Sequence, residues 1–263
     1  MNNSPDAGPA IKFRDVGYRL DDGRDLLRHL NLEVQRGETL VLLGRSGSGK
    51  TTTLKLINRL LTQSAGAIYV DGRSLEEWDV IRLRRMIGYV IQEVGLFPHF
   101  TVARNIGVVP QIEGWSADRI QSRVTELLQL VGLEPQLASR YPRELSGGQR
   151  QRVGVARALA ADPEFLLMDE PFGALDPITR AELQREFLSL QQRLGKTVVF
   201  VTHDLREALL LGTRIALMES GQLVVALRPD EFLRSSDPMV AAYVDAFKTE
   251  VSPAPRNRDE RSE

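Results

Sequence analysis

Short runs of consecutive apolar residues recur along this chain, and each run predicts a buried strand. Four of them lie between polar or glycine-rich segments, at Thr39–Leu43, Ile87–Ile91, Phe165–Met168 and Thr197–Thr202. Longer stretches between these runs carry apolar residues at helical spacing, and Gly195 marks the end of the stretch that begins at Ala181. Buried strands that alternate with helices predict an α/β fold built on a parallel sheet.

The N-terminal part of the chain follows a different pattern, in which apolar and polar residues alternate. Ile11–Leu20 alternates in this way, and Asp21–Gly23 is a turn signal before a returning strand. The apolar positions of that returning strand are Leu30, Leu32 and Val34. A further short strand follows the first helix at Ala67–Val70. These strands predict an N-terminal antiparallel β subdomain.

From about residue 97 to residue 155 the pattern becomes helical. Ser116 is a suitable N-cap for an amphipathic helix, and Gly132 is a suitable stop for it. The apolar face of this helix carries Ile120, Val124, Leu127, Leu128 and Val131. We therefore expect an α-helical subdomain inserted into the α/β domain. We expect residues 1–10 to form a flexible lead-in, 11–248 the folded domain, and 249–263 a disordered tail.

Composition narrows the class of protein. The chain has 263 residues, 42% of them hydrophobic, which is enough for a packed core. The net charge is −1, which argues against a general nucleic-acid-binding protein. The chain has no cysteine, so it forms no disulfide and no cysteine metal site. The apolar runs are too short to span a bilayer, so we expect any membrane role to require a partner.

The segment Gly44–Thr51 matches the phosphate-loop pattern of Gly, four residues, Gly-Lys and then Ser or Thr. It follows a predicted buried strand and precedes a predicted helix, which is the context that the pattern requires. Glycines allow successive backbone N–H groups to point at phosphate oxygens, and the helix N-terminus adds positive potential. Lys50 can reach the β- and γ-phosphates, and the Thr51 hydroxyl can ligate Mg²⁺. This loop predicts nucleotide binding.

Other polar residues at the ends of predicted elements allow two interpretations each. Asp169 and Glu170 follow a buried strand, where they could bind Mg²⁺ and accept a proton, or could be solvated carboxylates. His203 ends another buried strand, although a single histidine is more often structural. The segment Leu145–Gln149 leads into a helix and could bind an anion, or Ser146 could be an ordinary N-cap. Tyr18 could stack on a base or be an ordinary strand aromatic.

Taken together and in this order, these motifs resemble those of ATP-binding cassette ATPases. The resemblance rests on the phosphate loop, Gln92, the Leu-Ser-Gly-Gly-Gln segment, Asp169-Glu170, Ala174-Leu175-Asp176 and His203. It covers the chain from Ile11 to about Tyr243. Two segments, Ile87–His99 and Met168–Arg180, further resemble the ATPases of importers for glycine betaine, choline and carnitine.

The resemblance implies a role for each matching residue. Tyr18 would stack on adenine, Glu170 would be the general base, and His203 would contact the γ-phosphate. Gln92 would touch Mg²⁺ and the attacking water, and Mg²⁺ would also be held by Thr51 and Asp169. The ATP phosphates would be bound by Gly44, Arg45, Ser46, Gly47, Ser48, Gly49, Lys50, Thr51 and Thr52. Ser146, Gly147, Gly148 and Gln149 would contact the nucleotide of a second subunit, and Asp176 would lie at the dimer interface.

The resemblance also implies partners. The chain would form a homodimer closed by ATP and would bind transmembrane permease subunits at the cytoplasmic face of the inner membrane. A periplasmic or extracellular substrate-binding protein would take part indirectly, and no nucleic acid would be involved. The sequence leaves open an importer of another substrate, such as a polyamine, an amino acid or a metal. A non-transport cassette ATPase is a further alternative.

Overall fold

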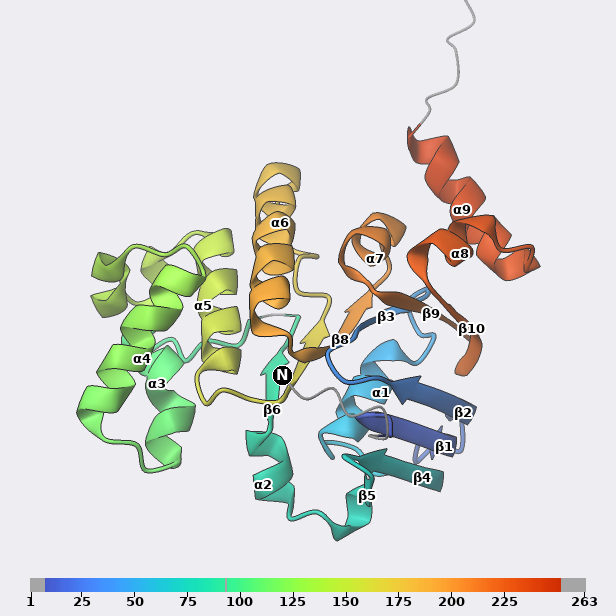
Figure 1. Cartoon of the computed structure of the whole chain (residues 1–263), viewed down its shortest axis with the longest axis horizontal. Coiled ribbons are helices and arrows are strands. Elements are labelled where there is room, and N and C mark those ends of the chain that lie inside the picture. Colours follow the sequence, from blue (N-terminus) through green and yellow to red (C-terminus); the bar gives the residue numbers. More distant parts are fainter. Residues whose placement is uncertain (1–7, 93, 252–263) are drawn as a thin grey trace, which may run out of the picture.

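The computed structural model describes residues 8–92 and 94–251. Its centre is a six-stranded sheet with the order β10-β9-β3-β8-β7-β6 (Figure 1). All neighbouring strands are parallel except the pair of β9 with β10 at one edge. The strands are β3 (Thr39–Leu43), β6 (Ile87–Val90), β7 (Phe165–Asp169), β8 (Thr197–Thr202), β9 (Arg214–Glu219) and β10 (Gln222–Leu227). The predicted parallel sheet is therefore confirmed.

The central strands are buried on both faces, which explains why they read as continuous apolar runs. In β3, Val41 and Leu43 contribute to one apolar cluster, which also contains residues of the helices. Leu40 and Leu42 contribute to a second cluster on the opposite face. Because alternate residues of a strand point to opposite faces, one short strand joins both cores. This double burial holds the end of β3, and hence the loop that follows it, in a fixed position.

A second, four-stranded sheet has the order β2-β1-β4-β5, and its strand pairs are antiparallel. It consists of β1 (Ile11–Arg19), β2 (Asp25–Val34), β4 (Ala65–Val70) and β5 (Arg73–Ser74). Helix α1 (Lys50–Ile57) lies between this sheet and the central sheet (Figure 1). Leu54, Leu56 and Ile57 of α1 are buried in the second apolar cluster. The predicted antiparallel subdomain is thus present and covers one side of the phosphate-loop helix.

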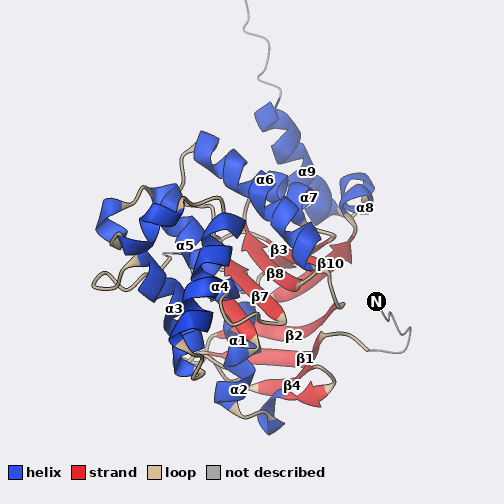
Figure 2. Cartoon of the chain, turned by 60° about the vertical axis from the view of Figure 1, so that its left-hand side comes forward, coloured by secondary structure: helices blue, strands red, loops and turns tan. Residues whose placement is uncertain are grey.

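The chain between β6 and β7 forms a lobe of helices to one side of the central sheet (Figure 2). The lobe contains α3 (Val102–Ile112), α4 (Ala117–Leu130) and α5 (Gly147–Leu159), with short 3-10 helices η2 (Pro135–Ser139) and η3 (Pro142–Glu144). The Ser116 side chain accepts a hydrogen bond from the Arg119 N–H, as expected of the N-cap of α4. Val124, Leu127 and Leu128 of α4 are buried. The inserted α-helical subdomain is therefore confirmed.

The remaining helices lie before β6 and after β7. They are η1 (Leu75–Glu77), α2 (Val80–Arg85), α6 (Pro177–Leu194), α7 (Leu205–Leu211), α8 (Pro229–Arg234) and α9 (Pro238–Val251). Helix α6 ends at Gly195, whose φ of 58° is left-handed, as predicted. It begins at Pro177 and not at Ala181, because Asp176 caps its first turn and proline suits the first helical position.

Two predicted segments lie partly or wholly outside the described residues. Residues 1–7 of the expected lead-in, 1–10, are not described. The expected tail, 249–263, begins within the last turn of α9 and continues into residues 252–263, which are also not described. Within residues 8–92 and 94–251, no helix has the length and apolar character needed to cross a membrane.

Candidate functional site

A large cavity of about 1220 Å³ lies where the carboxyl ends of β3, β7 and β8 meet. Polar residues that follow these strands are brought together there, because the carboxyl ends of parallel strands lie at one edge of the sheet. The cavity is lined by the phosphate-loop residues 44–47 and 49–52, and by Gln92, Glu170 and His203. Eight of the nine predicted phosphate-binding residues therefore share one cavity with all three predicted catalytic residues. Ser48 is buried beneath the loop.

Two glycines give the loop its path. Gly49 has a φ of 99° and precedes α1 as its N-cap, a conformation that residues with a Cβ rarely adopt. A Cβ added at Gly44 would lie 2.3 Å from the Met218 carbonyl oxygen of β9. The loop is therefore packed directly against the neighbouring strand. Glycine at position 44 is required by space, and glycine at position 49 by backbone conformation.

Lys50 is the cation of this loop. Its Nζ donates hydrogen bonds of 2.8 Å to the carbonyl oxygens of Gly44 and Arg45. Burial lowers the pKa of Lys50, while the carboxylates of Glu170, Asp169 and Glu219 act in the opposite direction. The carbonyl oxygens of the phosphate loop thus hold the Lys50 ammonium group in place, and three carboxylates lie near it. Such a group is available to a phosphate oxygen that enters the loop.

Thr51 and Asp169 bring two oxygen ligands together from different elements. The Thr51 hydroxyl donates a hydrogen bond of 2.9 Å to Asp169 Oδ1. Asp169 is 5% exposed, and burial raises the pKa of its carboxyl group, while the bond from Thr51 lowers it. Gln92, which follows β6, lines the same cavity. A hydroxyl, a carboxylate and an amide oxygen at one place are the hard ligands that suit Mg²⁺.

Glu170 and His203 form a close pair beside these ligands. His203 Nδ1 lies 3.2 Å from Glu170 Oε2. The Glu170 backbone has a φ of 44°, an uncommon left-handed conformation for a residue with a side chain. Its N–H nevertheless bonds to the Val201 carbonyl oxygen of β8 at 3.0 Å. This contact to the adjacent strand fixes the turn that directs the Glu170 side chain into the cavity.

The Leu-Ser-Gly-Gly-Gln segment lies elsewhere. Ser146 is the N-cap of α5, where its side chain accepts the Gln149 N–H and its own N–H bonds to Gln149 Oε1. Ser146 and Gly147 are exposed, and none of residues 146–149 lines the cavity. Asp176, the N-cap of α6, is also exposed and also lies outside the cavity. The structure therefore places this second group of predicted site residues away from the phosphate loop of its own chain.

Tyr18 is not among the residues that line the cavity, and its stacking on adenine stays a prediction. It lies in β1 opposite Leu27 of β2 and packs, partly buried, against the apolar cluster between the two sheets. The apolar residue of β2 that does line the cavity is Leu26. The pairing of β1 with β2 has register shifts on either side of Tyr18. Such a shift changes which side chains face a given side of the sheet, which explains why Leu26 and not Tyr18 lines the cavity.

One wall of the cavity was not foreseen from the sequence. Met239, Tyr243 and Phe247, which lie at helical spacing on α9, line it opposite the phosphate loop. Burial and the nearby Glu219 carboxylate raise the pKa of Tyr243, and its hydroxyl group lies beside the Arg45 backbone. The apolar periodicity of Pro238–Val251 predicts a buried helix face, but nothing local in the sequence indicates what that face covers.

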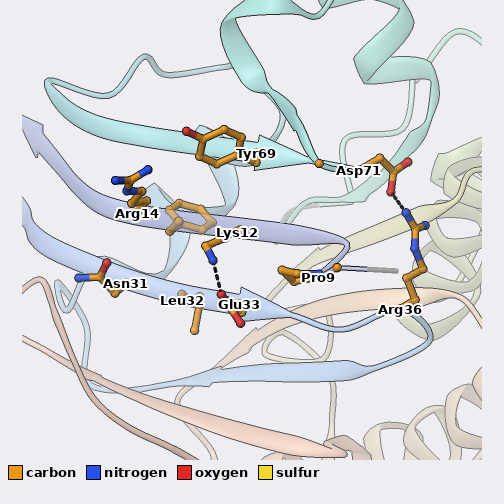
Figure 3. A pocket seen from close by; sticks show the side chains of 12 residues that line it. Pro9, Lys12, Arg14, Asn31, Leu32, Glu33, Arg36, Tyr69 and Asp71 are labelled. Atoms are coloured by element: carbon orange, nitrogen blue, oxygen red, sulfur yellow. Dashed lines mark ion pairs between the residues drawn. The ribbon is translucent and has the colours of Figure 1, made fainter. Parts of the chain in front are cut away.

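A further cavity of about 880 Å³ lies on the outer side of the antiparallel sheet (Figure 3). Its charged side chains are largely paired with each other, Lys12 with Glu33 at 2.7 Å and Arg36 with Asp71 at 2.6 Å. None of the predicted site residues lines it. The candidate functional site is therefore the cavity at the ends of β3, β7 and β8.

A glycine-rich loop between a buried strand and a helix, with carboxylates and a histidine at neighbouring strand ends, defines a phosphate-loop nucleotide-binding protein. Comparison with known families narrows this class. Residues 27–173, more than half of the chain, match the family model of the ABC transporter. The chain belongs to this family, and the resemblance predicted from its motifs is confirmed.

Curated relatives are about 50% identical to this chain over the aligned residues. The glycine betaine/carnitine/choline transport ATP-binding protein of Bacillus subtilis (strain 168) is 50% identical over 225 residues, which are 86% of this chain and 59% of that protein. The glycine betaine uptake system ATP-binding protein of Escherichia coli (strain K12) is 53% identical over 214 residues, 81% of this chain and 69% of that protein. The chain thus spans about three fifths of the length of the first of these relatives.

Solved cassettes share the fold. A dimeric ATP-binding cassette bound to ADP and Pi in a post-hydrolysis state has a TM-score of 0.75 and 33% identity. That match covers 83% of this chain and 98% of the solved chain. A cassette from Clostridium perfringens, part of an ABC transporter complex, has a TM-score of 0.80 and 28% identity over 94% of this chain and 96% of its own. The predicted fold class is confirmed.

Proposed function

We propose that this chain is the ATP-binding and ATP-hydrolysing subunit of a membrane importer for quaternary amines such as glycine betaine, choline or carnitine. One observation carries the ATPase part of the proposal: the phosphate loop, the Thr51–Asp169 pair and the Glu170–His203 pair line one cavity. Family membership supports the importer. The names of relatives that are about 50% identical to the chain over the aligned residues support the importer and its cargo.

In this proposal, the backbone N–H groups of the phosphate loop and the N-terminus of α1 bind the phosphates of ATP. Lys50 moves from its carbonyl partners to the β- and γ-phosphate oxygens. Thr51, Gln92 and Asp169 would hold Mg²⁺, and their oxygen atoms fit the preference of that ion. The ion would supply positive charge that neutralises the phosphate oxygens as the terminal bond breaks.

Glu170 acts as the general base of hydrolysis. Its carboxylate takes a proton from a water molecule whose oxygen attacks the γ-phosphorus, and ADP leaves with the electrons of the broken P–O bond. His203 lies 3.2 Å from this carboxylate and contacts the γ-phosphate, so it orients both groups. The carboxylate needs no movement to face the cavity, because the left-handed backbone at Glu170 already points it there.

The second group of predicted residues would complete the site in a dimer. Ser146–Gln149 lie outside the cavity of their own chain at the exposed N-terminus of α5, where N–H groups and the Ser146 hydroxyl can contact an anion. We propose that they contact the γ-phosphate bound to a second copy of the chain, with Asp176 at the same interface. ATP would then hold the two copies together.

The proposed partners are transmembrane permease subunits at the cytoplasmic face of the inner membrane. Gln92 would respond to the permease, because it lies at the end of β6 just before the helical lobe. A periplasmic or extracellular substrate-binding protein would deliver the quaternary amine to the permease. The cargo would not touch this subunit.

The decisive experiment substitutes Glu170→Gln, which keeps the size of the side chain and removes the base. We expect ATP turnover to fall by about 10²-fold or more while ATP binding is retained, because the phosphate loop is unchanged. The matched variant Lys50→Ala should weaken nucleotide binding itself. In cells that lack the wild-type chain, neither variant should restore uptake of labelled glycine betaine or choline.

Two outcomes would separate the parts of this proposal. Wild-type turnover by Glu170→Gln would reject the assignment of the base. Loss of polyamine, amino-acid or metal uptake in place of quaternary-amine uptake would reject the cargo and leave the ATPase in place.

A further inference from the structure

A buried carboxylate lies four residues after His203 and has no part in the mechanism proposed above. Glu207, in the first turn of α7, is 5% exposed. Both of its oxygens accept hydrogen bonds from neutral side chains. The Thr202 hydroxyl donates to Oε2 at 2.6 Å, and Gln184 Nε2 donates to Oε1 at 2.9 Å. A buried carboxylate with two close donors is held in one orientation.

Thr202 extends this network to the backbone around His203. It is the last residue of β8, and its Oγ1 accepts the N–H of Asp204 at 3.0 Å while donating its proton to Glu207. The Thr202 hydroxyl can play both roles only when Glu207 is an acceptor. The residues on either side of His203 are therefore tied to one another by the Thr202 hydroxyl, which the buried carboxylate orients. The direction in which the His203 side chain leaves β8 depends on this short turn.

The other end of the network lies on α6. Gln184 belongs to the helix that begins at Pro177, directly after the N-cap Asp176. Two further charges act on the carboxylate, Asp204 from the turn itself and Arg180 from α6. Side-chain hydrogen bonds from Thr202 to Glu207 and from Gln184 to Glu207 therefore connect the residue before His203 with α6. The His203 side chain also contacts Glu170.

We propose that Glu207 is a positioning residue for His203, which fixes the turn between β8 and α7 through Thr202 and links this turn to α6 through Gln184. This inference rests on the proposed role of His203 in ATP hydrolysis. The carboxylate touches neither nucleotide nor Mg²⁺ in this arrangement, so it acts only through His203. Its loss should change the rate of the chemical step and leave the binding of ATP to the phosphate loop intact.

The test removes the hydroxyl of the network without changing the shape of the side chain. In the full chain, Thr202→Val should lower kcat about tenfold, because displacement of a catalytic group by about an ångström has costs of this order. The KM for ATP and the affinity for a fluorescent ATP analogue should stay within about twofold. Thr202→Ser retains the hydroxyl and should restore kcat.

Two substitutions at Glu207 examine the same network from the other side. Glu207→Gln can still accept the Thr202 proton, and its amide can donate to Gln184 once the Gln184 amide turns over. It should therefore retain most of the activity. Glu207→Leu has no acceptor and should match Thr202→Val. Thermal unfolding shows whether Thr202→Val folds. If it does not, Glu207→Asp takes its place as the variant that breaks the network, because the shorter aspartate carboxylate no longer reaches the Thr202 hydroxyl.

A second background distinguishes positioning from general support of the fold. In a His203→Ala chain, Thr202→Val should lower the residual kcat no further, because its effect passes through the histidine. An equal loss in both backgrounds, or no loss in the wild-type background, would overturn the inference. If His203→Ala alone leaves hydrolysis unchanged, the role of His203 in the proposed function fails, and the positioning role fails with it.

Discussion

Asp169 and Glu207 are both buried carboxylates of this site region, yet their neighbours differ. Asp169 lies beside the phosphate loop, with Lys50 and Lys55 near enough to lower its pKa against the effect of burial. Glu207 has two neutral hydrogen-bond donors and the Asp204 carboxylate as neighbours, and burial raises its pKa above the ordinary value of 4.5. At the residue scale, the surroundings of Asp169 therefore suit the binding of a cation. The surroundings of Glu207 suit a carboxylate that orients the Thr202 and Gln184 side chains.

The raised pKa of Glu207 predicts how stability depends on pH. Its contribution is fully present below the unfolded pKa of 4.5 and is lost as pH rises through the higher folded pKa. Glu207→Gln cannot ionise, so the free energy of unfolding of the variant should improve relative to the wild type as pH rises through this window. Urea unfolding at a series of pH values measures it. Glu182→Gln, which removes an exposed carboxylate of α6, is the control and should show a constant difference.

A difference between Glu207→Gln and the wild type that stays constant, or that moves in favour of the wild type with rising pH, would contradict this prediction. Either result would mean that the hydrogen bonds from Thr202 and Gln184 outweigh the effect of burial.

At the residue scale, the sequence predicts those site residues whose position follows from a short motif or from the end of a buried strand. The phosphate loop is a local motif, and Glu170 and His203 each follow a buried strand, so the sheet brings them together. The stacking of Tyr18 on adenine stays a prediction, because register shifts lie on either side of Tyr18 in the pairing of β1 with β2, and no local pattern encodes them. Glu207 was missed because its partners, Thr202 and Gln184, are recognised only once α6 and α7 are packed.

At the scale of elements, the helical lobe and the phosphate-loop helix α1 contribute to different apolar clusters. The lobe core contains Leu127 of α4, and the lobe carries the exposed start of α5. The phosphate-loop helix α1 contributes instead to the cluster between the two sheets. The boundaries of the lobe helices follow their caps, Thr101, Ser116 and Ser146, which explains why the sequence predicts the lobe well. Helix α9 was not predicted, and amphipathic spacing would in any case reveal a buried face but not its partner.

Leu127→Ala tests the contribution of the lobe. Leu127 is 0% exposed, and truncation of such a side chain to alanine lowers the free energy of unfolding by about 2–5 kcal/mol. Urea unfolding should show this loss, while Gln129→Ala on the exposed face of α4 should stay within about 0.5 kcal/mol of the wild type. The affinity of the phosphate loop for ATP should change little under conditions where both proteins are folded. A loss below about 0.5 kcal/mol for Leu127→Ala would show that α4 is not packed as described.

At the scale of the whole molecule, the predicted site residues of one chain lie in two separate places. The cavity holds the phosphate loop, Glu170 and His203, whereas Ser146 and Asp176 lie outside it. One chain does not bring these groups together in the structure, and we propose that a second chain does. Two chains in opposite orientation can do so twice, which gives two equivalent sites for a pair of ATP molecules.

Mixing of two variants tests this shared site. In a Glu170→Gln background, Lys50→Ala and Ser146→Arg proteins should each fail to occlude ATP stably. In a one-to-one mixture, some heterodimers place both defects in the same site. Their other site then has an intact Lys50 and an intact Ser146, and it should trap about one labelled nucleotide per heterodimer.

Mixtures of two copies of the same variant are the control and should trap nothing. Absence of trapped nucleotide in samples shown to contain heterodimers would mean that the two sites close only together or that each chain holds a complete site.

The strand order also has a consequence for synthesis of the chain. Within the described residues, strand β3, which precedes the phosphate loop, pairs with β8 and β9 alone, and Thr39 of β3 lies opposite Val198. Both partners leave the ribosome about 150 residues later, which at typical rates of translation is roughly 8–30 s. During this interval the apolar β3 has no sheet to join, although the antiparallel hairpin can already form. The nascent chain therefore exposes an unpaired apolar strand during this interval, and we expect a chain truncated before Thr197 to lack the neighbours that hold the phosphate loop in place.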